Sequence, residues 1–117
     1  MAPKQNGNSN FKTNWNQKAE QQQLYLQFDL NLHELAKYLG ANRRELSNYI
    51  NEEFGVNFND YINQKRVLAF ERKIVNGEQE KLTLLSLAYD SGFNSKATFH
   101  RAFKKYKGIT PKEFVEA

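Results

Sequence analysis

The chain has 117 residues, with 17 lysines and arginines against 13 aspartates and glutamates, and it has no cysteine. This length allows one domain with a modest core, and the lack of cysteine excludes disulfides, thiolate zinc sites and thiol nucleophiles. No apolar run approaches the roughly 18 residues of a membrane span, so we expect a soluble, cytoplasmic domain with a mild basic excess of +4.

The N-terminal region is the least patterned part of the sequence. Residues 1–16 are polar and rich in Asn, Gln and Lys, which is typical of a flexible arm or a linker remnant. We place the domain at residues 17–117. Residues 17–27 are helix-prone and predict a short leading helix.

Two helices are predicted over residues 31–56, the first unit of the domain. Asn31 stands three residues before Glu34, which is a capping-box spacing with Asn in place of Ser or Thr. Apolar residues at helical spacing then continue to Gly40. Asn42 repeats the cap, so a second helix begins there and a further glycine ends it.

A longer helix is predicted over residues 58–75, between Asn57 and the Asn76-Gly77 pair. At ~1.5 Å per residue this helix spans about 27 Å. It can therefore act as a rigid strut.

A second pair of helices is predicted over residues 83–108. Thr83 caps the first of them, Gly92 lies in the turn, and Ser95 caps the second. Thr110 and the proline that follows it begin a short last helix. No segment shows strand alternation, so the fold class is all-α, with about seven helices.

The two units are copies of one pattern. The matching pairs are Leu32 and Leu84, Leu35 and Leu87, Ala36 and Ala88, Gly40 and Gly92, Asn42 and Ser95, Leu46 and Phe99, Ile50 and Phe103, and Gly55 and Gly108. Each copy contains a helix, a glycine turn, a second helix and a glycine stop, which is the outline of a helix-turn-helix. Two copies predict two recognition helices that enter two stretches of one DNA groove.

The second helix of each copy supplies the candidate DNA contacts. Its first exposed positions are Arg43, Arg44, Ser47 and Asn48 in the first copy, and Lys96, Ala97, His100 and Arg101 in the second. Arg can bridge guanine, Asn can bridge adenine and Ala can touch a thymine methyl, so these are candidate base-reading residues. The helix starts at Asn42 and Ser95, together with Lys104 and Lys105, are candidate phosphate contacts.

Some features of the sequence also fit functions other than DNA binding. A basic amphipathic helix is more often a solvated surface, and the first copy is acidic at Glu45, Glu52 and Glu53. These features also fit a helical protein-interaction module without DNA-binding activity. The repeat favours DNA, as does the basic run from Ser91 to Lys112, which no acid interrupts. The sequence has no glycine-rich phosphate loop, metal-spaced histidines or catalytic triad, so we expect no enzyme, metal or cofactor.

A set of motifs at fixed spacing supports a family resemblance. The motifs are Leu35-Ala36, Leu46, Phe54-Gly55, Tyr61-Ile62 and Arg66 in the first part, and Leu87-Ala88, Gly92-Phe93, Ser95, Phe99, Phe103-Lys104-Lys105-Tyr106, Gly108-Ile109-Thr110-Pro111 and Phe114 in the second. With them, the chain from about Leu30 to Phe114 resembles the DNA-binding domain of the AraC/XylS family of bacterial transcription regulators. The resemblance implies seven helices and two recognition helices in successive major-groove segments on one DNA face. It places the base-reading positions of the family on Arg44, Ser47, Asn48, Lys96, Ala97 and Arg101.

The resemblance also carries expectations about the parent protein. It implies sequence-specific double-stranded DNA binding, transcriptional activation more often than repression, RNA polymerase as a further partner, and no small-molecule ligand within this domain. It implies a sensor or dimerisation domain that this chain lacks. The sequences of residues 57–65 and 92–105 are also similar to those of regulators with a membrane-anchored N-terminal part. Phe70 and Lys73 depart from the alanine and leucine usual in the family, which leaves the packing of the central helix open.

Overall fold

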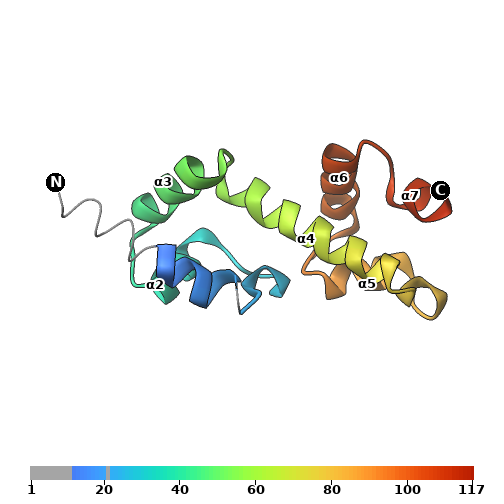
Figure 1. Cartoon of the computed structure of the whole chain (residues 1–117), viewed down its shortest axis with the longest axis horizontal. Coiled ribbons are helices and arrows are strands. Elements are labelled where there is room, and N and C mark those ends of the chain that lie inside the picture. The colour runs from blue at the N-terminus through green and yellow to red at the C-terminus, as the bar shows by residue number, and fades with distance from the viewer. Residues whose placement is uncertain (1–11, 21) are drawn as a thin grey trace.

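The computed structural model describes residues 12–20 and 22–117, and these residues are helices joined by short turns (Figure 1). In chain order the elements are η1 (Trp15–Glu20, a π-helix), η2 (Leu24–Leu26, a 3₁₀ turn), α2 (Leu32–Leu39), α3 (Arg43–Phe54), α4 (Phe58–Val75), η3 (Glu78–Glu80, a 3₁₀ turn), α5 (Leu84–Asp90), α6 (Lys96–Lys107) and α7 (Pro111–Glu116). No strand occurs in this part of the chain. The prediction of an all-α fold with two helix-turn-helix units is confirmed.

Side-chain caps begin the helices at the residues that the sequence predicted. The capping side chains that accept a hydrogen bond from the backbone N–H three residues later are Asn31, Asn42, Asn57, Thr83, Ser95 and Thr110. At Asn42 and Thr110 the cap is reciprocal, because the glutamate three residues later accepts from the backbone N–H of the cap residue. These caps satisfy donors that a helix start otherwise leaves unpaired.

Helix α4 joins the two units (Figure 1), and it contributes residues to two hydrophobic cores. The first core contains Leu35, Ala36, Leu39, Leu46 and Ile50, with Tyr61, Ile62 and Ala69 of α4. The second contains Leu87, Ala88, Phe93, Phe99, Ala102 and Phe103, with Val67 and Phe70 of α4. The described residues therefore form an elongated body of 53 × 23 × 22 Å with one helix shared by both cores.

The structure shows how α4 packs at Phe70, where the sequence departs from the family pattern. Its side chain is 0% exposed, and its ring centroid lies 4.8 Å from that of Phe99 and 5.6 Å from that of Phe103. The larger ring thus fills the second core. Lys73 is half-buried on the same helix, whereas Leu68 is 42% exposed.

The predicted boundary of the N-terminal arm was wrong. Residues 1–11 of that arm lie outside the described residues, but residues 12–16 are helical. Trp15 is only 1% exposed, and its ring centroid lies 5.3 Å from that of Tyr61 and 5.7 Å from that of Phe54. Burial of this large indole against the first unit orders the segment.

The predicted leading helix over residues 17–27 is also shorter than expected. The π-helix ends at Glu20, and a separate 3₁₀ turn follows at Leu24–Leu26. Gln23 has a left-handed φ of 52° at the start of this turn. The break redirects the chain so that Tyr25 can enter the first core.

Candidate nucleic-acid interface

The first turns of α3 have an exposed polar face and a buried apolar face. Leu46 and Ile50 are completely buried beneath the helix. Arg43, Arg44 and Asn48 are exposed, and Ser47 is half-buried. The structure therefore brings the predicted base-reading residues of the first unit together on one helix start, immediately after the Asn42 cap.

The first turns of α6 repeat this arrangement in the second unit. Phe99 and Phe103 are buried, whereas the predicted reading residues that surround them are exposed, namely Lys96, Ala97, His100 and Arg101. The His100 ring lies edge-on to the Phe99 ring at a centroid distance of 5.4 Å, so packing holds the imidazole at the helix surface.

The candidate arginines and the first lysine of α6 are free to meet an anionic partner. None of the ion pairs formed within the described residues involves Arg43, Arg44, Lys96 or Arg101. An unpaired guanidinium can bridge a guanine edge without first giving up a carboxylate.

The two candidate phosphate lysines at the end of α6 differ in their surroundings. Lys105 Nζ lies 3.3 Å from Asp60 Oδ1 of α4, and Tyr106 Oη donates to the Asp60 carbonyl oxygen at 3.1 Å. Burial, the Asp60 charge and its hydrogen bond raise the pKa of Tyr106. Lys104 is exposed. Hydrogen bonds with Thr110, and more weakly the charge of Lys104, lower the pKa of Glu113 on α7.

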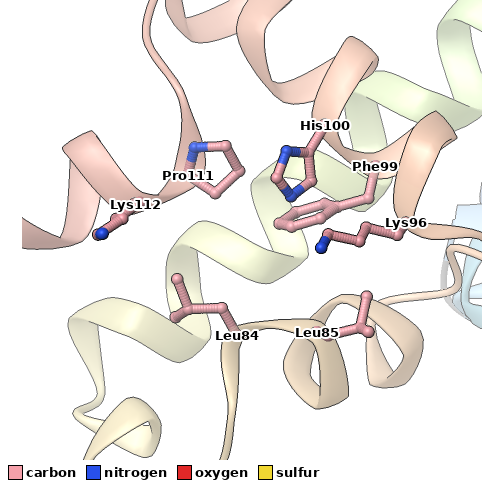
Figure 2. Close-up of a pocket in the computed structure, with 7 residues that line it drawn as sticks. All are labelled: Leu84, Leu85, Lys96, Phe99, His100, Pro111 and Lys112. Carbon is pink, nitrogen blue, oxygen red and sulfur yellow. The ribbon is translucent and has the colours of Figure 1, made fainter.

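A surface cavity of about 250 Å³ lies where α5, α6 and α7 meet (Figure 2). Its lining residues are Leu84, Leu85, Lys96, Phe99, His100, Pro111 and Lys112. Figure 2 shows Lys96, Phe99 and His100 on the α6 side of the cavity, across from the leucines of α5. The lining has an apolar floor, basic groups at its edge and no acidic residue.

Lys112 is the residue of this surface that the sequence analysis did not select. It belongs to α7 rather than to a recognition helix, and only the fold brings it to the same cavity as Lys96. The signal in the sequence was the basic run without acids, which ends at Lys112.

The described residues contain neither a cluster suited to a metal ion nor a helix suited to a membrane. Across residues 12–20 and 22–117, no three His, Cys, Asp or Glu side chains gather in a way that could hold a metal ion. In the same part of the chain, no helix has the length and apolar character that a membrane crossing requires.

Comparison with known proteins shows the family. The family model of a helix-turn-helix domain matches residues 35–117. The chain therefore belongs to this helix-turn-helix family, of the AraC/XylS type, and the resemblance noted from the sequence is confirmed.

Individual relatives agree with this assignment. The chain is similar to an uncharacterized HTH-type transcriptional regulator of Staphylococcus aureus strain COL, with 31% identity over 99 residues, which cover 85% of this chain and 13% of that protein. It is also similar to the probable transcription factor PqrA of Proteus vulgaris, with 28% identity over 82 residues, or 70% of this chain and 65% of that protein. The chain thus spans about 13% of the length of the Staphylococcus relatives.

Two solved structures share the fold. One is the C-terminal domain of the two-component response regulator yesN of Fusobacterium nucleatum, with a TM-score of 0.69, 29% identity and coverage of 80% of this chain and 88% of that chain. The other is the C-terminal domain of AraT, a response regulator from Geobacillus stearothermophilus, with a TM-score of 0.71, 25% identity and coverage of 81% and 76%.

Proposed function

We propose that this chain binds double-stranded DNA sequence-specifically in transcriptional regulation, and that α3 and α6 read two successive segments of the major groove. The observation that carries the proposal is the repeated arrangement of these helices. Each begins at a side-chain cap, is buried on one face, and exposes unpaired polar and basic residues in its first turns. Recognition helices need this combination of a packed face and an exposed N-terminal end.

The proposed roles follow from exposure. The base-reading residues are Arg43, Arg44, Ser47 and Asn48 on α3, and Lys96, Ala97, His100 and Arg101 on α6. Asn42 and Ser95 cap helix starts whose backbone N–H groups would meet phosphates. Lys104 and Lys105 would add phosphate contacts, and so would Lys112, because it borders an acid-free cavity beside α6.

We infer a larger regulator around this domain. The two structural neighbours are C-terminal domains of response regulators by title, and the Staphylococcus relatives are much longer than this chain. The proposal therefore includes a separate sensor or dimerisation domain. From the family resemblance it also includes transcriptional activation, RNA polymerase as a further partner and a place in the bacterial cytoplasm.

Selection from a random pool of DNA duplexes near physiological salt, followed by sequencing, tests the proposal. We expect enrichment of a bipartite motif whose two segments lie about one helical turn, roughly 10 bp, apart. Enrichment of one short segment would mean that a single unit reads bases. No enrichment by the folded chain would contradict the proposal and favour the alternative, a helical protein-interaction module.

Two substitutions test the reading residues on the selected site. Arg44→Ala and Arg101→Ala should each weaken binding by about 1–3 kcal/mol and relax the preference at one base position. Fluorescence anisotropy with the selected duplex and its single-base variants measures both effects. An equal loss on the selected and on random duplexes would show that the arginine contacts phosphate instead of a base.

A further inference from the structure

The short segment Leu24–Gln27 precedes the first unit but contacts both units. Leu24 and Tyr25 pack with the first core, where Tyr25 is buried. The backbone of the same segment lies against the turn between α5 and α6 of the second unit, as the surroundings of Gly92 show. The family match begins at residue 35, so this segment lies outside it.

The side chain of Arg66 on α4 binds the backbone of this segment. The side chain is 7% exposed; Nε donates to the Tyr25 carbonyl oxygen at 2.7 Å and Nη2 donates to that of Gln27 at 2.8 Å. Burial lowers the pKa of Arg66 to about 10, so the guanidinium is charged at neutral pH. Arg72 adds a hydrogen bond from Nη2 to Tyr25 Oη at 3.1 Å.

Gly92 is the point where the second unit meets the segment. Its φ is +105°, and a Cβ there would lie 2.2 Å from the Tyr25 carbonyl oxygen, 2.7 Å from Arg66 Nε and 3.1 Å from Leu26 Cα. The distances to the Tyr25 oxygen and to Arg66 Nε are too short for any side chain at this position. The Tyr25 oxygen and Leu26 Cα are also backbone atoms, so they cannot rotate away. Any side chain would therefore push the segment off the turn.

The equivalent glycine of the first unit has no such neighbour. Gly40 has a φ of +75°, and a Cβ there would meet nothing within 4 Å. Both turns thus require a left-handed residue, but within the repeat only the Gly92 turn is covered by the segment. Conformational need explains Gly40 fully. Close approach of another part of the chain is an additional reason for Gly92.

We propose that Gly92 and Arg66 are positioning residues, which seat the segment Leu24–Gln27 between the two units and so fix the relative orientation of α3 and α6. Without the segment, α4 is the main structural link, and a single long helix can bend. The ion pairs from Lys105 and Lys107 of α6 to α4 are partly exposed, and such pairs hold an angle weakly. The segment supplies a second, buried point of support.

The consequence for DNA rests on the proposed function. A bipartite site is bound tightly only if both recognition helices meet their segments at once, since the second contact is then intramolecular. In a regulator with a preceding sensor domain, movement of this segment would change binding to the bipartite site without touching either reading surface.

Gly92→Ala, with Gly40→Ala as the matched control, tests the inference on DNA. Both changes place Ala at a positive φ, but only the first displaces the segment. We expect Gly92→Ala to lower the affinity for the bipartite duplex at least about tenfold more than Gly40→Ala does. Because each change strains the turn of its own unit, Gly92→Ala should weaken binding to the isolated second segment no more than Gly40→Ala weakens binding to the isolated first segment. Equal losses for the two variants would overturn the proposal.

A measurement without DNA separates this inference from the proposed function. The chain has no cysteine, so Glu52→Cys on α3 and Glu116→Cys on α7, both exposed, can carry spin labels for a distance measurement by pulsed electron paramagnetic resonance. We expect a narrow distance distribution in the parent chain and in Gly40→Ala, and a broader or shifted one in Gly92→Ala.

A second variant covers the case in which Gly92→Ala fails to fold, as judged by circular dichroism. Arg66→Met removes both hydrogen bonds to the segment without adding a clash, so it should also broaden the distribution. An unchanged distribution in a folded variant would overturn the proposal, whatever the outcome of the DNA selection. If the selection fails while the distribution broadens, the proposed function is wrong and the positioning role stands.

Discussion

Two adjacent lysines at the end of α6 differ in their availability for a phosphate contact because only one of them has an ion-pair partner among the described residues. Lys104 is exposed and forms none of the ion pairs of the described residues, whereas Lys105 lies 3.3 Å from Asp60 of α4. A lysine already close to a carboxylate has less to gain from a phosphate. The two positions have the same side chain and adjacent places on one helix, so each is the control for the other.

Lys104→Ala should weaken binding to all DNA sequences alike and lower the slope of log K against log salt by about 1. Lys105→Ala should change the slope less, because its partner Asp60 offsets the charge. Anisotropy titrations at several salt concentrations with selected and random duplexes measure both. A larger slope change for Lys105→Ala would mean that DNA displaces Asp60 and that Lys105 is the main phosphate contact.

At the scale of the element, the N-terminal π-helix η1 behaves as part of the domain. Its only tryptophan, Trp15, contacts rings from α3 and α4 and donates from Nε1 to Glu20 at 3.2 Å. Glu20 in turn pairs with Lys65 of α4 at 2.9 Å. The element is therefore tied to the first unit by both apolar and polar contacts.

Trp15→Ala should lower the free energy of unfolding by about 3–5 kcal/mol, because it removes a large ring that is 1% exposed. Phe28→Ala is the control, since Phe28 is 62% exposed and its loss should cost less than about 0.5 kcal/mol. Urea unfolding followed by circular dichroism measures both, without relying on the fluorescence of the tryptophan that is removed. Equal stability of the two variants would mean that η1 is not part of the folded core.

The elements that sequence predicted well are those whose signals are local. Asn42 with Glu45, and Thr110 with Glu113, define helix starts within four residues, and the apolar spacing of α6 gives its exposed face. What sequence missed depends on partners far along the chain. Trp15 is ordered by α3 and α4, Lys112 reaches the α6 cavity through the fold, and Lys105 meets an aspartate 45 residues away.

At the scale of the whole molecule, the length of the domain and the rigidity of α4 between the two units together determine which DNA sites the chain can bind. The described residues extend over 53 Å, which is enough to reach two major-groove segments about 34 Å apart. The 18-residue helix α4 joins the two cores and gives the chain little freedom to follow a change in spacing. We therefore expect a change in the distance between the two DNA segments to weaken binding as much as a change in their base sequence.

Inserting base pairs between the two segments of the selected site tests this rigidity. An insertion of about 5 bp turns the second segment to the opposite face of the duplex, and one of about 10 bp restores the face but adds about 34 Å. Because α4 cannot lengthen, both insertions should reduce the affinity to that of a single segment, a loss of about a hundredfold or more. Units joined by a flexible linker would recover binding with the full-turn insertion. Such recovery in anisotropy titrations would show that the two units move independently in solution.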